Sequence, residues 1–216
     1  MKKEYAAAPH SMETMQTYGF SWMDFVTAIP ASLFLATTWK NNGKPNACLQ
    51  SWACFSGNQD GFFAFLSNVN KGGHFYRTLK ETGACVLNFP SADVYDRCTE
   101  TIRNNGWDTD ELASSGLTAE PATLVHAPRV RECFLALECE YLWEREITEG
   151  SAQTLACLKI RNICMDEAYL DEAAQGRYGE TGYLYNVHYP VNPETYRGKS
   201  SDSLAVLHKI RSTGEY

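Results

Sequence analysis

Leu33-Phe34-Leu35-Ala36-Thr37-Thr38 is an apolar run that ends in β-branched residues, which is typical of a buried strand. The turn Asn42-Gly43-Lys44 follows, and its Asn and Gly tolerate the tight backbone of a hairpin. The chain then continues as Asn46-Ala47-Cys48-Leu49-Gln50-Ser51-Trp52. This second run places small, polar and aromatic groups one after another where a strand leaves a turn. We expect it to line a planar ligand that carries a phosphate.

Strand-like runs surround this hairpin at close spacing. They cover residues 32–39, 46–55 and 62–67, and the segments between them are rich in Asn, Gly and Asp. Such residues are typical of turns, so we predict an antiparallel meander.

The rest of the chain continues the mainly β pattern. We predict a helix over 74–81 that stops at Gly83, a strand over 84–89, a helix over 91–105 on the spacing of Val94, Cys98 and Ile102, a loop over 106–130, and strands over 133–146 and 154–165. Six strands with few long helices, and no repeated strand-helix-strand unit, favour a β-barrel, closed or split, over a doubly wound sheet.

The predicted strand over 133–146 alternates in polarity. One face carries Leu137, Cys139, Tyr141 and Trp143, and the other carries Glu138, Glu140 and Glu144. Clean alternation is typical of a sheet with one buried face. We therefore expect the acidic face to be exposed to water or to meet a partner.

Three segments make up the predicted domain organisation. Residues 1–27 form an N-terminal arm, residues 28–175 form the barrel domain, and residues 176–216 form an extension rich in aromatic residues. Because so aromatic a segment is poor in disorder signals, we expect it to pack on the domain or on a second subunit.

Composition excludes several classes of protein. A formal net charge of −7 argues against a nucleic-acid partner, which requires clustered Lys and Arg. No segment approaches the roughly 18 apolar residues of a membrane span, and the N-terminus lacks the apolar core of a secretory signal. We therefore expect a cytoplasmic protein that does not bind a membrane.

The eight cysteines form no Cys-x-x-Cys pair, which argues against a structural metal site. Several lie within apolar runs, where a reduced cysteine packs as a small hydrophobe. Cys48 and Cys54 lie near the expected ligand and could exchange electrons with it. We favour packing or backbone-contact roles for both, because no adjacent positive charge would make either thiol reactive.

Familiar catalytic motifs are absent: the sequence contains no Gly-x-Ser-x-Gly, Walker loop, His-Glu-x-x-His or Gly-x-Gly-x-x-Gly after a strand. We therefore assign no catalytic acid, base or nucleophile. A second segment, residues 66–74, instead joins a strand end to two glycines and a helix start. Unpaired N–H groups at such a start favour a phosphate, and Lys71 and His74 add donors there.

Further motifs follow one another in a characteristic order across about residues 28–170. In chain order they are Ala36-Thr37-Thr38, Gly43-x-Pro45-Asn46, Ser51-Trp52, the strand over 62–67, Lys71-x-x-His74-x-Tyr76, the run from Glu81 to Pro90, Gly116-Leu117-Thr118-x-x-Pro121-Ala122 and Leu137-Glu138-Cys139. In this ordered set the chain resembles the flavin reductase-like, FMN-binding split-barrel family, which includes the flavoredoxins.

The resemblance implies a split β-barrel of Greek-key type, a homodimer, and one FMN per subunit at the barrel rim near the interface. It implies that the segment with Asn46, Ala47, Cys48, Ser51, Trp52 and Ala53 lines the flavin ring and ribityl chain, and that Ser67, Asn68, Lys71 and His74 hold the phosphate end. Thr37, Thr38 and Gly73 are further implied cofactor contacts. Phe75 departs from the pattern, since many members carry Ser or Thr after the histidine and so gain a hydroxyl contact to the phosphate.

Simpler roles compete for several of these residues. Asn46 could satisfy a turn, Trp52 could belong to the barrel core, and Lys71 could be an ordinary surface lysine. His74 could cap its own helix. Thr37 and Thr38 need no role beyond strand formation.

Three functions are compatible with the sequence. The first is an FMN-dependent oxidoreductase that passes electrons from NAD(P)H or another donor to a flavin, a metal complex or a protein. The second is a non-enzymatic electron carrier of the flavoredoxin kind. The third is a barrel that binds a ligand other than FMN, which Phe75 and the aromatic extension leave open.

Overall fold

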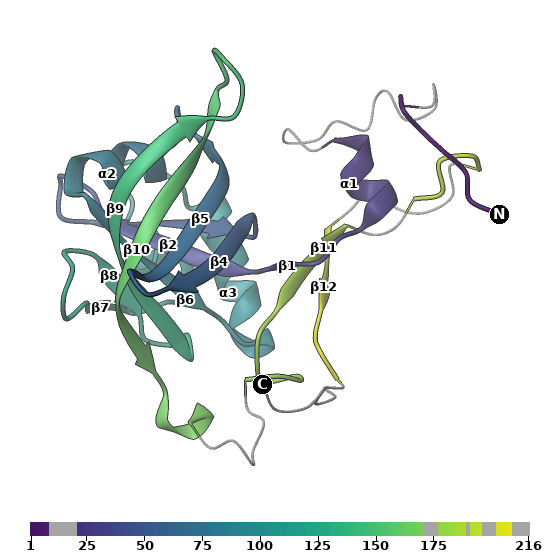
Figure 1. Cartoon of the computed structure of the whole chain (residues 1–216). Helices are drawn as coiled ribbons and strands as arrows, with labels where there is room; N and C mark the ends of the chain where they lie inside the picture. The colour runs from purple at the N-terminus through teal and green to yellow at the C-terminus, as the bar shows by residue number, and fades with distance from the viewer. Residues whose placement is uncertain (9–20, 171–176, 189–190, 196–201, 209–216) are drawn as a thin grey trace. The chain divides into compact units, whose positions relative to one another are not determined.

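The computed structural model describes residues 1–8, 21–170, 177–188, 191–195 and 202–208 (Figure 1). The chain divides into two compact units. The larger comprises Ser32–Leu184 with Val206–Tyr216, and the smaller comprises Met1–Ala31 with Tyr185–Ala205. The predicted boundaries after residues 27 and 175 stay predictions, and part of both terminal segments lies outside the described residues.

A seven-stranded antiparallel sheet forms the larger unit. Its strands, in spatial order, are β3 (Pro45–Gln50), β2 (Phe34–Trp39), β6 (Ala84–Phe89), β9 (Leu135–Glu146), β10 (Gln153–Met165), β5 (Gly61–Asn70) and β4 (Ala53–Asn58). The mainly β prediction is confirmed. The pairs β2–β6 and β5–β10 join strands far apart in sequence, as in a Greek key.

The predicted pairings of the meander are confirmed, because β2 pairs with β3 and β4 pairs with β5. The run predicted as one strand over 46–55 is divided into β3 and β4, which do not pair with each other. They are the two edges of the sheet, although only Ser51 and Trp52 separate them in sequence. Seven flat strands would place their edges about 29 Å apart, whereas the three Cα–Cα steps from Gln50 to Ala53 span at most about 11 Å. The sheet therefore curls into a barrel that is left open between β3 and β4 (Figure 1).

Helices and short elements complete the larger unit. They are α2 (His74–Thr82), α3 (Ala92–Arg103), the single-turn helices η2 (Ala113–Ser115) and η3 (Glu167–Tyr169), and a hairpin of β7 (Ala119–Pro121) and β8 (Pro128–Val130) within the expected loop. The predicted stop of α2 is confirmed, because Gly83 takes a left-handed φ of 70° that glycine adopts without strain.

The buried face of α3 differs from the one predicted. Val94, Cys98 and Thr101 are buried, whereas Ile102 is 62% exposed. Seven residues complete nearly two helical turns, so Thr101 lies under Val94, while an eighth residue turns away by about 80°. The polar Thr101 is accepted in the core because its hydroxyl donates to the Cys98 carbonyl at 2.7 Å.

The alternation predicted for β9 is interrupted once on each face. Glu138 is fully buried, because its carboxylate accepts backbone hydrogen bonds from Thr123 and Leu124. At Leu142 a bulge shifts the register against β10, so Trp143 no longer shares the face of Tyr141 and is 40% exposed.

The main core lies inside the curled sheet and under α2. Its most buried members come from five strands and one helix and include Phe34, Leu66, Leu79, Leu87 and Leu158. Five of the eight cysteines are buried, and all eight are free thiols, so packing roles are confirmed for these five. Cys54 is exposed on the edge strand β4.

The smaller unit consists of α1 (Trp22–Thr27) and a three-stranded sheet of β1 (Ala31–Ser32), β11 (Tyr185–His188) and β12 (Asp202–Ala205). Ser21 caps α1 in a capping box with Asp24. Phe25 packs on Val191 and on the ring of His188, with ring centroids 4.9 Å apart. In the described part of the chain, no helix is both long and apolar enough to span a bilayer.

Candidate functional site

A cavity of about 220 Å³ lies where β3, the end of β5 and the start of α2 meet. Its lining residues are Asn46, Ala47, Cys48, Gln50, Asn68, Val69, Asn70, Gly73, His74, Phe75, Tyr76 and Asn105. Six of these are predicted site residues, and they come from both predicted segments. The fold therefore brings the two segments together.

Asn46 contributes an unsatisfied donor to this cavity. It pairs with Thr38 across the β2–β3 hairpin and is only 2% exposed. Its Nδ2 atom is buried and has no hydrogen-bond partner among the described residues. A buried amide without a partner costs free energy, which a ligand acceptor at this position would recover.

Asn68 is held in the cavity wall by an irregular backbone. Its φ of 59° is left-handed, although it lies within β5. The register against β10 shifts at the same place, between Thr154 and Ala156. Left-handed backbone in a residue other than glycine is uncommon and gathers at binding sites, and Asn tolerates it better than most residues.

Gly73 is the N-cap residue of α2 at the cavity and has no side chain to cap the helix. The N–H groups of the first turn therefore lack partners within the helix and face the cavity. The positive end of the helix dipole lies at the same place. A Cβ on Gly73 would lie 3.3 Å from the Asn70 carbonyl oxygen, so the close turn favours glycine. Such a helix start is suited to an anionic group.

A buried ion pair supports the cavity from behind. Lys40 and Glu111 are both fully buried, and Nζ lies 2.7 Å from Oε1. The second carboxylate oxygen of Glu111 accepts from the backbone N–H of Ala47 at 2.8 Å. His74 Nδ1 lies 3.8 Å from Glu111 Oε1. The segment around Glu111 is thereby fixed to β3 and to the start of α2.

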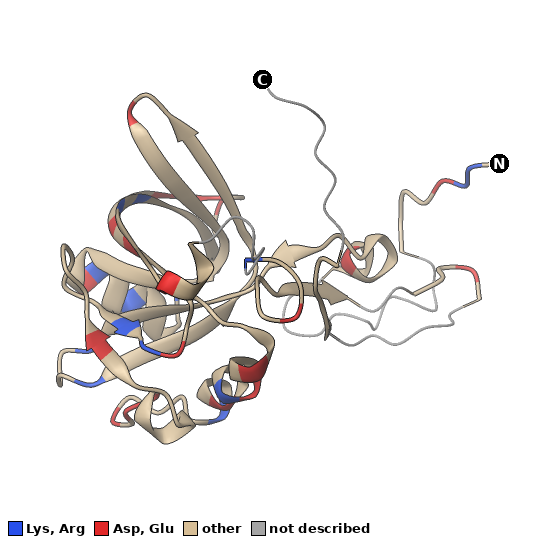
Figure 2. Cartoon of the chain, turned by 90° about the horizontal axis from the view of Figure 1, so that it is seen from below, with Lys and Arg blue, Asp and Glu red and all other residues tan. Residues whose placement is uncertain are grey.

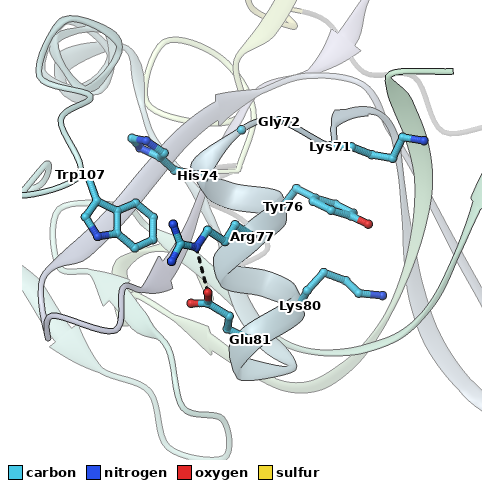
Figure 3. Close-up of a pocket in the computed structure, with 9 residues that line it drawn as sticks. Lys71, Gly72, His74, Tyr76, Arg77, Lys80, Glu81 and Trp107 are labelled. Carbon is cyan, nitrogen blue, oxygen red and sulfur yellow. Dashed lines mark hydrogen bonds and ion pairs between the residues drawn. The ribbon is translucent and has the colours of Figure 1, made fainter.

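A wider groove of about 720 Å³ adjoins the cavity along α2 and shares Gly73, His74 and Tyr76 with it. Figure 3 shows His74, Arg77 and Trp107 on one side of α2 and Lys71, Tyr76 and Lys80 on the other. The Arg77 guanidinium lies 4.2 Å from the centre of the Trp107 ring. The groove therefore combines cationic and aromatic groups.

Carboxylates balance the cations of this groove. Lys71 pairs with Glu146, Arg77 with Glu81, and Lys80 with Glu144. Figure 2 likewise shows basic and acidic residues interspersed over the described chain. Lys71 thus lines the groove but not the cavity, and its ammonium is already paired.

Thr37 and Thr38 line neither of these two spaces. Both are fully buried. The Thr37 hydroxyl donates to the Pro128 carbonyl at 2.5 Å and accepts from the Asn88 side-chain amide at 3.0 Å. The Thr38 hydroxyl lies 2.6 Å from that of Thr78. Their hydroxyls bond within the barrel wall.

The remaining predicted residues lie at the junction of the barrel edges. Ser51 and Trp52 connect β3 to β4, Ala53 begins β4, and Ser67 N donates to the Trp52 carbonyl at 2.9 Å. None of these four residues lines the cavity or the groove. Phe75 is 4% exposed and belongs to the main core, although it also contacts the cavity.

Several residues at the site carry no local sequence signal. Glu111 and Trp107 lie in the segment expected to be loop, and Lys40 reads as the end of a strand. A charged residue in a loop is usually exposed, and only tertiary structure pairs Lys40 with Glu111 in the interior. Burial raises the pKa of the Cys48 thiol, so Cys48 lines the cavity as a neutral group.

These residues fit a flavin with a phosphate. The cavity offers amide donors, a histidine and a helix start at one end and backbone groups of β3 at the other. Its volume of about 220 Å³ is below the range of roughly 300–1,000 Å³ that is typical of ligand pockets, but the adjoining groove extends it.

Comparisons with known proteins identify the family and the fold. The model of the flavin reductase like domain matches residues 26–186. Flavoredoxin of Desulfovibrio vulgaris (Miyazaki F) is similar in fold, with a TM-score of 0.68 and 21% identity over 99% of this chain and 97% of that one. A candidate flavin reductase with a split barrel domain from Shewanella frigidimarina has a TM-score of 0.76 and 14% identity over 99% and 100% of the two chains.

A curated relative is similar over a shorter stretch. This uncharacterized protein from Methanothermobacter thermautotrophicus is 29% identical over 62 residues, and the match covers 29% of each chain. The two solved structures share too few identical residues with this chain to show more than the fold, and that fold is the predicted split barrel. Because the family model covers most of the sequence, the chain belongs to the flavin reductase-like domain family, whose members are flavin-linked oxidoreductases.

Proposed function

We propose that this chain binds FMN in the cavity between β3 and α2 and is an oxidoreductase that transfers electrons through it. The observation that carries the proposal is the meeting, in one cavity, of an unpaired buried donor on Asn46 with the uncapped start of α2 at Gly73. A flavin mononucleotide has both a ring rich in acceptors and a phosphate. The proposed donor is NAD(P)H or another reductant, and the proposed acceptor is a flavin, a metal complex or a protein.

The chain's own residues bind and orient the cofactor. Asn46 and the backbone of Ala47 and Cys48 contact the ring end, and Asn68, His74 and the first turn of α2 hold the phosphate end. The flavin supplies the hydride and electron chemistry when it is bound. No side chain of the cavity is assigned as a catalytic acid, base or nucleophile.

A visible absorption spectrum of the purified protein tests the proposal. We expect a yellow protein, or a colourless one that becomes yellow on titration with FMN. Oxidation of NADH and NADPH with added FMN, FAD or ferric complexes then identifies the donor and acceptor. A colourless preparation that takes up neither FMN nor FAD would falsify flavin binding at this site.

An electron carrier is the second candidate function, and the structural likeness to flavoredoxin favours it. A carrier would hold FMN that a reduced iron-sulfur protein reduces, while NADH and NADPH leave it oxidised. Rapid-mixing absorbance measurements with both kinds of donor separate the two functions. A barrel that binds another ligand is the outcome if the protein folds but binds no flavin.

We also propose that the protein is a cytoplasmic homodimer. Apolar side chains on β5 and β9 support an interface, because Phe62 is 38%, Leu142 41% and Trp143 40% exposed. Light scattering across a range of concentrations measures the mass in solution. A mass of 24.2 kDa at all concentrations would show a monomer.

A further inference from the structure

Glu111 connects both ends of the candidate cavity through one carboxylate. Oε2 accepts from the Ala47 N–H of β3 at 2.8 Å. Oε1 lies 2.7 Å from Lys40 Nζ and 3.8 Å from Nδ1 of His74, the first residue of α2. The side chain of Glu111 is fully buried, so water does not weaken these interactions.

The ring of His74 is oriented by its surroundings. Nδ1 is buried and has no hydrogen-bond partner among the described residues, whereas the side chain as a whole is 31% exposed. The exposed part of the ring therefore lies away from Nδ1, in the cavity and groove that His74 lines. Trp107 meets the ring nearly edge to face, with centroids 5.1 Å apart and planes at 78°.

We infer that Glu111 is a positioning residue for His74 that sets the affinity for the ligand's phosphate. Its carboxylate accepts the Nδ1 proton after a small movement of the ring, which leaves Nε2 facing the cavity. A bound phosphate then shares one proton with Nε2 in a hydrogen bond. This inference rests on the proposed function, because that function supplies the phosphate.

The neighbouring charges are consistent with this role. An ion pair with Lys40, whose Nζ lies 2.7 Å from Oε1, holds the Glu111 carboxylate in place. Lys71 and Arg77, which line the adjoining groove, are paired with Glu146 and Glu81. Among the described residues, Glu111 is the carboxylate that an ion-pair distance joins to His74.

A comparison of FMN with riboflavin, which lacks the phosphate, tests the inference. The measured quantity is the ratio of the riboflavin to the FMN dissociation constant, from fluorescence titration of the full-length protein. We expect Glu111→Gln and His74→Ala each to lower this ratio by roughly tenfold to a hundredfold, with little change for riboflavin. The double variant should lower this ratio no further than either single variant does.

Two further variants sharpen the experiment. His74→Gln places an amide donor near the position of Nε2, and this amide does not need Glu111 to orient it. In the Glu111→Gln background, His74→Gln should therefore restore part of the lost preference for FMN over riboflavin. His126→Gln changes an exposed histidine outside the cavity and should leave the ratio unchanged. A Glu111→Gln protein that keeps the full preference for FMN would overturn the inference.

Nitrogen NMR of the ligand-free protein provides a test that needs no substitution at Glu111. We expect neutral His74 to carry its proton on Nδ1, with the exposed His126 as the reference. Neutral His74 protonated on Nε2 would overturn the inference even if Glu111→Gln does not fold. If no flavin binds, the proposed function fails on its own; if flavin binds but the ratio is unchanged in the variants, only the inference fails.

Discussion

Lys40 and Glu111 form an ion pair 2.7 Å apart in which neither side chain is exposed. Lys40 Nζ also donates to the carbonyls of Gly106 at 2.9 Å and Thr109 at 2.8 Å. One lysine therefore fixes the 106–111 segment to the end of β2. That segment in turn places Trp107 beside His74 and Arg77.

Removing the lysine should destabilise the protein strongly. Lys40→Met leaves the Glu111 carboxylate buried without its cation, and we expect a loss of about 3–5 kcal/mol in the free energy of unfolding. Urea unfolding followed by circular dichroism measures it. The control is Arg103→Met, which removes an exposed i,i+3 partner of Glu100 and should change stability by less than about 1 kcal/mol. Equal effects of the two variants would contradict the assigned role of Lys40.

Asn46→Leu should separate stability from ligand binding. The substitution removes a buried donor that has no partner, so the free energy of unfolding without ligand should stay the same or rise. The affinity for FMN should fall by roughly tenfold, because the ligand loses a hydrogen bond. Thermal unfolding and fluorescence titration of one preparation give both quantities. Loss of stability together with unchanged affinity would show that Asn46 has a structural role.

Asn68 gives a second opportunity to separate the two effects. Asn68→Gly relieves a left-handed backbone and should preserve stability, whereas Asn68→Val should lose about 1–3 kcal/mol. Both variants lack the amide and should bind FMN more weakly. Melting temperatures and FMN titrations check this prediction. If Asn68→Gly binds FMN as tightly as the unchanged protein, the amide does not contact the ligand.

Glu138 anchors the turn between β7 and β8 rather than facing water. Its carboxylate accepts from Thr123 N at 2.9 Å and Leu124 N at 2.7 Å. We expect Glu138→Ala to increase hydrogen exchange at these two amides and to cost about 1–3 kcal/mol. Glu140→Ala, two residues along β9 and partly exposed beside Arg161, is the matched control. If the Thr123 and Leu124 amides exchange at the same rate in Glu138→Ala as in the unchanged protein, Glu138 does not anchor this turn.

The stabilising effect of Glu144 should depend on pH. Burial alone would raise the pKa of its carboxyl, but hydrogen bonds from Tyr76 and Tyr141 and the Lys80 ammonium outweigh burial and lower the pKa below its ordinary value of 4.5. The ionised form is therefore the stabilising one. Its contribution should be complete above pH 4.5 and should disappear as the pH falls through the lowered pKa.

Urea unfolding of the unchanged protein and of Glu144→Gln, between pH 3 and pH 7, measures this contribution. We expect a difference of roughly 1 kcal/mol at neutral pH that shrinks in acid. A difference that is constant across this range, or that grows in acid, would contradict the assignment.

Local sequence patterns predicted most of the strands and both longer helices. Period-two alternation and turn residues locate the strands, and Gly83 locates the end of α2. The patterns did not predict strand order, because β3 and β4 read as one run across Ser51 and Trp52. They also placed Ile102 rather than Thr101 in the core. The helical period decides which residue of α3 is buried, and here it outweighs the polarity of the side chain.

The candidate site was predicted in part. Asn46, Ala47, Cys48, Asn68, Gly73 and His74 line one cavity. Thr37 and Thr38 bond within the barrel wall, and Lys71 pairs with Glu146. Whether all thirteen predicted residues contact a cofactor stays a prediction, and the variants above address the central ones.

By itself, the sequence determined the mainly β class, the two segments that meet at the cavity and the family, because these depend on short-range patterns and ordered motifs. Only the tertiary structure decided that β3 and β4 are opposite edges of one curled sheet. It alone also buried Lys40 with Glu111 behind His74, because a charged pair enters the core only when distant segments supply both charges and their hydrogen bonds. Pairing between residues so far apart in sequence produces no local sequence pattern from which it could be predicted.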